Sequence, residues 1–340
     1  MREGYRSTPL PEWLVAALLL TVAPAVQAYD WLTTGFLAFG DLYTVPSNHL
    51  PEGDGATGLV LRRAYLTFDG DFSESMDGRF RLELNQSGEF ETYLLELQIK
   101  DLWLRWRWRE QSMIVGLSPT PTFDFIESQW GKRYLMRTPM DLQGEPSRDV
   151  GVAFSGPLGG SPLNYRLKVG SGADFGGESS EVSKVMVALN WPIDDQWTVE
   201  FYTDYEGLTG SDDEFTLQGF VGYRADQWRF GAQYSNQERG EEPDLELASA
   251  YAIRTLSPRM DLIGRVDRII EPSPRGNNIS YIPFDPTAPA TLWLAGLEFR
   301  HGEHFRWTPN VIYIRYGEND QGEVPKSDLH LRLTAFIDFE

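Results

Sequence analysis

Apolar and ionisable side chains alternate along residues 328–339. One side of this segment carries Leu329, Leu331, Leu333, Ala335, Ile337 and Phe339, and the other carries Asp328, His330, Arg332, Thr334 and Asp338, with Phe336 as the only apolar residue among them. Successive side chains of a β-strand point to opposite faces, so a period of two predicts a strand. Because one face is apolar and the other charged, the strand is expected to lie between two different environments.

The same two-faced pattern recurs along the whole chain. We predict strands near residues 31–40, 58–70, 77–86, 93–108, 112–118, 148–156, 163–171, 182–191, 196–206, 214–224, 226–235, 244–255, 259–270, 290–300, 304–316 and 327–339. An even number of strands is expected for a bacterial outer-membrane barrel, and short turns alternate with long connections as they do in such barrels. The pattern therefore predicts an all-β fold, a single transmembrane antiparallel barrel of about 16 strands, with counts from fourteen to eighteen left open.

The apolar faces of several predicted strands end in Trp or Tyr, for example at Trp108, Trp191 and Tyr234. Aromatic side chains gather at the lipid–water boundary of membrane barrels. Aromatic residues make up 13% of the sequence, while the mean hydropathy is only −0.36. That value is too low for a helical membrane protein but fits a barrel, because alternation hides the apolar faces in the average. A secreted soluble β protein, such as a carbohydrate-binding sandwich, remains an alternative.

The first 28 residues have the features of a secretory signal peptide. Arg2 and Arg6 precede the short apolar run 13–22, and small residues lead to a predicted cleavage site between Ala28 and Tyr29. The run is too short to span a bilayer as a helix. We therefore expect residues 1–28 to be removed on export and residues 29–340 to form the barrel.

Composition argues against several classes of function. The sequence has no Cys, so it offers neither disulfides nor thiolate metal sites. Its formal net charge of −20 argues against a nucleic acid as partner. The four His residues show no spacing typical of a metal site, and no nucleotide or redox motif is present. We predict no metal, no cofactor and no catalytic residues, with a barrel enzyme such as an outer-membrane lipase as the alternative from another class.

Three segments resemble the phosphate-selective porins of the O/P type from Gram-negative outer membranes. They are the arginine-bearing strand 61–70 that ends in Gly, the passage 115–121 from a strand into a long loop, and the Arg-Asp-x-Gly-Val strand 148–152 with the hairpin that follows it. The resemblance implies a sixteen-stranded barrel that assembles as a homotrimer. It also implies passive diffusion of small anions past a long loop folded into the lumen.

Two sets of basic residues are candidates for the function. In the loop 119–147, the resemblance implies that Lys132, Arg133 and Arg137 lie at the narrowest point of the pore, and a solvent-exposed surface loop is the alternative. We predict a lumen-facing basic wall of Arg79, Arg81, Arg105, Arg107, Arg109, Arg166 and Lys168. Arginine stays charged at any relevant pH, so such a wall would raise the local concentration of anions. The alternative is that these side chains only pair with carboxylates and keep the wall solvated.

Together these features predict an outer-membrane porin, a passive channel for small hydrophilic solutes with a bias to phosphate-like or small organic anions. The expected partners are outer-membrane lipids, lipopolysaccharide and small anionic solutes. A general or cation-preferring porin remains an alternative, because the overall charge is acidic.

Overall fold

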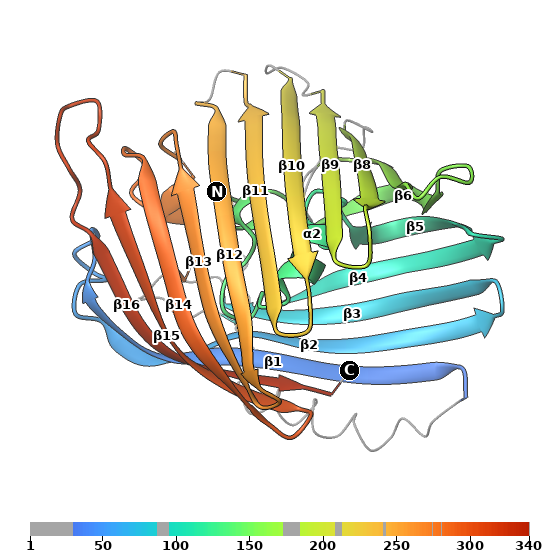
Figure 1. The fold of residues 1–340 in the computed structure, drawn as a ribbon, viewed down its shortest axis with the longest axis horizontal. Helices are drawn as coiled ribbons and strands as arrows, with labels where there is room; N and C mark the ends of the chain where they lie inside the picture. The colour runs from blue at the N-terminus through green and yellow to red at the C-terminus, as the bar shows by residue number, and fades with distance from the viewer. Residues whose placement is uncertain are drawn as a thin grey trace, which may run out of the picture.

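The computed structural model describes residues 30–86, 95–172, 184–207, 213–240, 243–273, 275–279 and 281–339. The predicted signal peptide and its cleavage site at Ala28 and Tyr29 lie outside these residues. Each strand pairs antiparallel with the next one along the chain, and β1 (Leu32–Ser47) pairs with β16 (Asp328–Asp338), as Figure 1 shows in blue and red. The described residues thus form a closed barrel of sixteen antiparallel strands, which confirms the predicted fold class.

The other strands lie close to the predicted segments. They are β2 (Thr57–Ser73), β3 (Met76–Gln86), β4 (Leu95–Trp108), β5 (Gln111–Pro119), β6 (Arg148–Pro157), β7 (Asn164–Gly170), β8 (Lys184–Pro192), β9 (Trp197–Glu206), β10 (Glu214–Arg224), β11 (Trp228–Glu238), β12 (Leu245–Ser257), β13 (Met260–Ile269), β14 (Ala290–His301) and β15 (Phe305–Tyr316). Within the described ranges, no helix is long and apolar enough to cross a membrane.

The two rims of the barrel differ in the length of their connections. Short turns join β2 to β3, β4 to β5, β10 to β11, β12 to β13 and β14 to β15. Longer connections join β1 to β2, β5 to β6 and β13 to β14 at the opposite rim. We call these ends the short-turn rim and the long-loop rim. This asymmetry agrees with the predicted alternation of turn lengths and is typical of membrane barrels.

The two faces of each strand follow the sequence pattern. On β16, Leu331 and Leu333 point outward and are exposed, whereas His330 and Thr334 point inward and are buried. Exposed aromatic side chains gather near the short-turn rim: Trp106, Trp108, Trp191, Trp197, Trp228 and Trp307. The outer surface of the barrel is therefore apolar with a girdle of Trp at one end, which is the surface that a hydrocarbon environment requires.

Candidate functional site

Residues 120–147, between β5 and β6, fold into two short helices. α2 (Asp124–Trp130) ends at Gly131, whose left-handed backbone (φ 62°) lets its N–H donate to the carbonyl of Glu127 at 2.7 Å. α3 (Pro139–Leu142) begins at Pro139, which suits a first helical turn because that position needs no N–H donor. These local signals give the long segment a compact shape.

The apolar side chains of this segment pack against the inner face of the barrel. The buried ones are Phe123, Ile126, Trp130, Tyr134, Leu135, Met136, Met140 and Leu142, and they share one core with side chains of β10, β12, β13, β14, β15 and β16. The ring centroid of Trp130 lies 4.9 Å from that of Tyr251 on β12, and that of Tyr134 lies 4.6 Å from that of Phe336 on β16. Burying one large apolar side chain contributes about 1.5–3 kcal/mol. The segment is therefore held to this half of the wall, and Figure 1 shows α2 within the ring of strands.

Side chains of the wall also bind the backbone of this segment. Arg62 of β2 donates to the carbonyls of Tyr134 and Leu135. Gln218 of β10 donates to the carbonyl of Thr122 at 2.5 Å, and Arg265 of β13 donates to the carbonyl of Arg137 at 2.7 Å. Because these three donors come from separate parts of the barrel, they fix the segment across the interior.

Lys132 is buried, and its ammonium lies between two carboxylates of the wall. Its Nζ atom is 2.6 Å from Oε2 of Glu298 on β14 and 3.1 Å from Oδ2 of Asp261 on β13. Burial lowers the pKa of Lys132, although the two carboxylates act in the opposite direction. An ammonium removed from water needs such carboxylate partners. Lys132 joins the segment to the wall.

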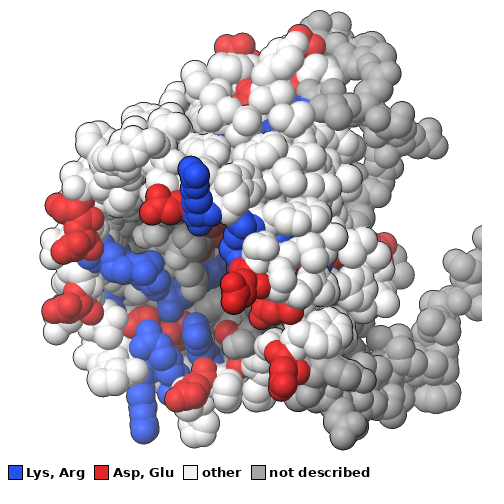
Figure 2. Space-filling model, turned by 90° about the vertical axis from the view of Figure 1, so that its right-hand side faces the viewer, with Lys and Arg blue, Asp and Glu red and all other residues white. Residues whose placement is uncertain are grey.

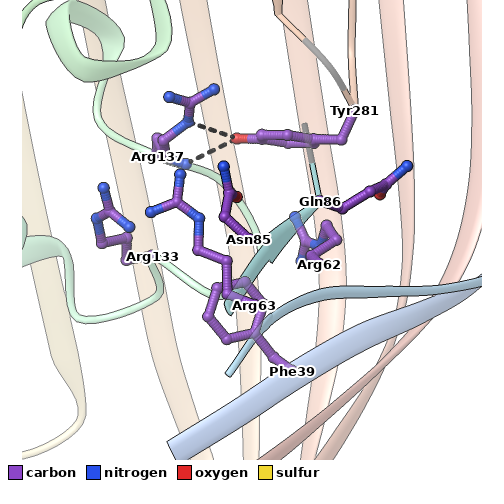
Figure 3. Close-up of a pocket in the computed structure, with 8 residues that line it drawn as sticks. All are labelled: Phe39, Arg62, Arg63, Asn85, Gln86, Arg133, Arg137 and Tyr281. Carbon is purple, nitrogen blue, oxygen red and sulfur yellow. Dashed lines mark hydrogen bonds between the residues drawn. The ribbon is translucent and has the colours of Figure 1, made fainter. Parts of the chain in front are cut away.

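Arg133 and Arg137 lie beside a small cavity of about 20 Å³. Arg133 pairs with Glu127 at 2.7 Å and with Asp141 at 2.5 Å, and Arg137 contacts Asp141 at 3.5 Å. Figure 3 shows the guanidinium groups of both residues and of Arg63 directed into the same space, with Nε of Arg137 3.5 Å from the hydroxyl of Tyr281. The other lining residues are Phe39, Arg62, Asn85 and Gln86. The cavity is thus rich in guanidinium donors, each of which also has a carboxylate partner.

Two carboxyl groups of the segment lie next to each other beside Arg133. Burial and the neighbouring carboxylate of Asp141 raise the pKa of Glu127 to about 7, while Arg133 acts in the opposite direction. The pKa of Asp141 is lowered, because Arg133, Arg137 and Arg63 favour its charged form more strongly than burial disfavours it. The two groups differ because Asp141 receives more of the arginine contacts. Glu127 is therefore the group whose charge changes near neutral pH.

The inward arginines of the N-terminal half are paired with carboxylates. Arg79 lies directly opposite Asp69 in the β2–β3 register and binds it at 2.7 Å, and Arg105 lies opposite Asp77 in the β3–β4 register and binds it at 3.0 Å. The remaining pairs join Arg107 to Asp77, Arg81 to Asp101 and Arg166 to Asp124. Figure 2 shows the hollow at one end of the molecule, where Lys and Arg gather with Asp and Glu among them. The wall is therefore a mixed-charge surface.

Two members of the predicted basic wall have surroundings that differ from those of the others. Lys168 is buried, and its ammonium donates to the carbonyls of Ser118 and Asp149 at 2.7 Å each, so it has a structural role between neighbouring strands. Arg109 lies in the turn between β4 and β5, exposed and with a left-handed backbone (φ 53°). Arg109 therefore lies one residue beyond the end of β4 at Trp108 and not on the strand that carries Arg105 and Arg107.

Three inward arginines that the sequence prediction omitted lie near the short-turn rim. They are Arg224 of β10, Arg229 of β11 and Arg306 of β15, and together with Lys132 and Arg300 they line a cavity of about 370 Å³. The sequence holds a signal for the first two, since Arg224 and Arg229 flank the short turn 225–227. In the structure they lie directly opposite each other in the β10–β11 register. Among the described residues, no group of His, Asp or Glu is arranged to hold a metal ion.

The chain matches no protein-family model, and a comparison with curated proteins gives no match. Its fold is similar to those of solved outer-membrane proteins. These include an anion-selective porin from Comamonas acidovorans (11% identity, 91% of this chain and 99% of that chain, TM-score 0.65), the outer membrane channel DcaP of Acinetobacter baumannii (9%, 91% and 97%, 0.65), and in-vitro folded OmpT of Vibrio cholerae in a trimer form (12%, 91% and 99%, 0.57). At these identities the likeness concerns the fold alone, and it shows that the chain has the closed sixteen-stranded antiparallel barrel of outer-membrane porins.

Proposed function

We propose that this protein is an outer-membrane channel through which small hydrophilic solutes diffuse passively, with a bias to anions. The observation that carries this proposal is the opposite character of the two barrel faces. Large apolar side chains with a Trp girdle cover the outside, while ion-paired charged side chains line the inside of the N-terminal half. A barrel of this size has room for an aqueous passage, and only such a surface is stable in hydrocarbon.

In this proposal, the segment 120–147 narrows the passage. Its apolar side chains cover the wall of β10 and β12–β16, which leaves the passage beside the charged wall of the N-terminal strands. Arg133 and Arg137 face the remaining space together with Arg63, while Lys132 holds the segment in place. The size limit is then set by the position of the segment, and the charge preference by the cations that lie around it.

The anion bias has two supports. One is the set of inward arginines at the short-turn rim that have no carboxylate partner among the described residues, namely Arg224, Arg229 and Arg306. The other is the resemblance of segments 61–70, 115–121 and 148–172 to phosphate-selective porins, together with a structural neighbour described as an anion-selective porin. A general or weakly cation-preferring channel is the second candidate, because every inward arginine of the N-terminal wall that we predicted is neutralised by a neighbouring carboxylate.

The proposal includes export and assembly. Residues 1–28 would act as the signal peptide and residues 29–340 would fold in the outer membrane, in contact with lipid and lipopolysaccharide. A homotrimer is proposed from the resemblance and from the trimer form named for one structural neighbour. N-terminal sequencing of the mature protein should begin at Tyr29, and cross-linking in membranes should give a threefold mass. A start other than Tyr29 or a monomer would contradict these two points separately.

The channel itself is tested in a planar bilayer. The refolded mature protein should produce stepwise ion conductance, and its reversal potential under a KCl gradient should have the sign of an anion preference. A reversal potential of the opposite sign would leave the channel but refute the anion bias. Absence of conductance, together with hydrolysis of lipid by the purified protein, would favour an enzyme.

A further inference from the structure

Arg224 and Arg229 form a cross-strand pair of like charges on the inner face of the barrel. They are the terminal register pair of β10 and β11, next to the short turn 225–227. Like charges directly opposite each other destabilise a sheet. Among the residues that the structure describes, neither guanidinium has a carboxylate within ion-pair distance. By contrast, Arg79 and Arg105 in the N-terminal half lie directly opposite the carboxylates that bind them.

The pair opens into the cavity of about 370 Å³ at the short-turn rim. Two carboxylates line this cavity, those of Asp226 and Asp261. The carboxylate of Asp261 already binds both Lys132 and Arg300, so it leaves the pair uncompensated. No ion pair joins Asp226 to either arginine in the described residues. The cavity therefore has a surplus of positive charge.

Two contacts keep guanidinium groups in place around this cavity. The Nη1 atom of Arg229 lies against Gly131, where an added Cβ would be only 2.9 Å away. The guanidinium carbon of Arg306, which also lines the cavity, lies 5.2 Å from the ring centroid of Phe336. These groups are thus positioned without a counter-ion of their own.

We propose that this cavity is a binding site for a small oxyanion with two or more negative charges, held between Arg224 and Arg229. A guanidinium offers a planar fork of donors that matches a carboxylate or a phosphate group. Side chains directly opposite on neighbouring strands have Cβ atoms about 4.5–5.5 Å apart, so one compact polyanion can contact both forks. Its charge also removes the repulsion between the two arginines. The site deepens the proposed channel function, since it lies on the inner face at one mouth of the barrel.

Binding is measured on the full mature protein, refolded in detergent, by calorimetric titration with inorganic pyrophosphate at low salt. Succinate is titrated in parallel, which distinguishes a phosphate site from a dicarboxylate site. The double variant Arg224→Gln with Arg229→Gln should weaken binding of the preferred anion by at least about tenfold, which corresponds to about 1.4 kcal/mol. The variant Arg224→Lys with Arg229→Lys keeps the charge but loses the forks, and it should show a smaller loss.

The control variant is Arg268→Gln with Arg315→Gln. These two exposed, outward-facing arginines lie on β13 and β15 near the long-loop rim, and both are register partners of Thr291. The control loses the same two charges from the outer surface, so binding should stay unchanged. Equal affinity in the control and in the Arg224 and Arg229 variant would overturn the site. The channel proposal is tested independently of the binding site. Binding that depends on Arg224 and Arg229, without any bilayer conductance, would refute the channel but support the binding site.

Discussion

Replacement of Lys132 by Met is the sharpest test of how the segment 120–147 is held. Methionine has a similar length and no charge, so the variant removes the ammonium from between Asp261 and Glu298 while it keeps most of the packing. The side chains of Lys132, Asp261 and Glu298 are at most 3% exposed, so solvent does little to screen the carboxylate charges that remain when the ammonium is removed. Removal of one partner from a buried ion pair costs about 3–5 kcal/mol, because the remaining charge stays buried without compensation.

We expect Lys132→Met to lower the free energy of unfolding by about 3 kcal/mol, at the lower end of that range, since Arg300 still binds both carboxylates. The assay is urea unfolding of the refolded protein in lipid vesicles, followed by Trp fluorescence. Adding Glu298→Gln to the Lys132→Met variant should restore part of the loss, because it removes the uncompensated charge. The reasoning is refuted if the single variant unfolds like the wild type, or if the double variant loses the sum of the two single effects.

Three further predictions concern the pH response, a close strand contact and the lipid-facing surface. The pKa of Glu127 is raised to about 7, so the stabilisation that it contributes is fully present below its ordinary carboxyl pKa and is lost as pH rises through about 7. The negative charge that Glu127 gains there should also shift the reversal potential toward cations. Glu127→Gln should remove both changes near pH 7, and a change that persists in this variant contradicts the assignment to Glu127. Gly151→Ala would place a Cβ 2.2 Å from the carbonyl oxygen of Val169 and should destabilise the barrel by about 1–3 kcal/mol in the same unfolding assay, whereas Gly219→Ala, with no heavy atom within 4 Å, should have little effect. Phe201→Arg, at an outward position that is 62% exposed, should cost about 2–4 kcal/mol if that face meets the bilayer core, and stability equal to that of Phe201→Leu would contradict the orientation of the face.

The strands and their faces could be predicted from local sequence. Residues 214–224 were predicted as a strand and form β10 with the same bounds, and the apolar side of 328–339 is the outer side of β16. A strand places every second side chain on one face, so alternation carries this information without knowledge of the rest of the chain. The predicted segment 93–108 and β4 both end at Trp108, but the prediction counts Arg109 on the wall by extending the alternation one residue past the strand.

The partners of the charged residues could not be predicted in the same way. Arg105 and Arg107 have no acidic residue between them in the sequence, yet Asp77 of the neighbouring strand binds both. Lys132 and Glu298 are far apart along the chain and meet only because the segment 120–147 crosses to β14.

The sequence by itself therefore determined which segments are strands and which side of each is apolar, because that information repeats every two residues. Only the tertiary structure decided which cations are neutralised and which are not, because charge compensation depends on the register between strands and on where the long segment lies. The same reason separates the paired arginines of the N-terminal wall from Arg224 and Arg229, which the register brings together without a carboxylate.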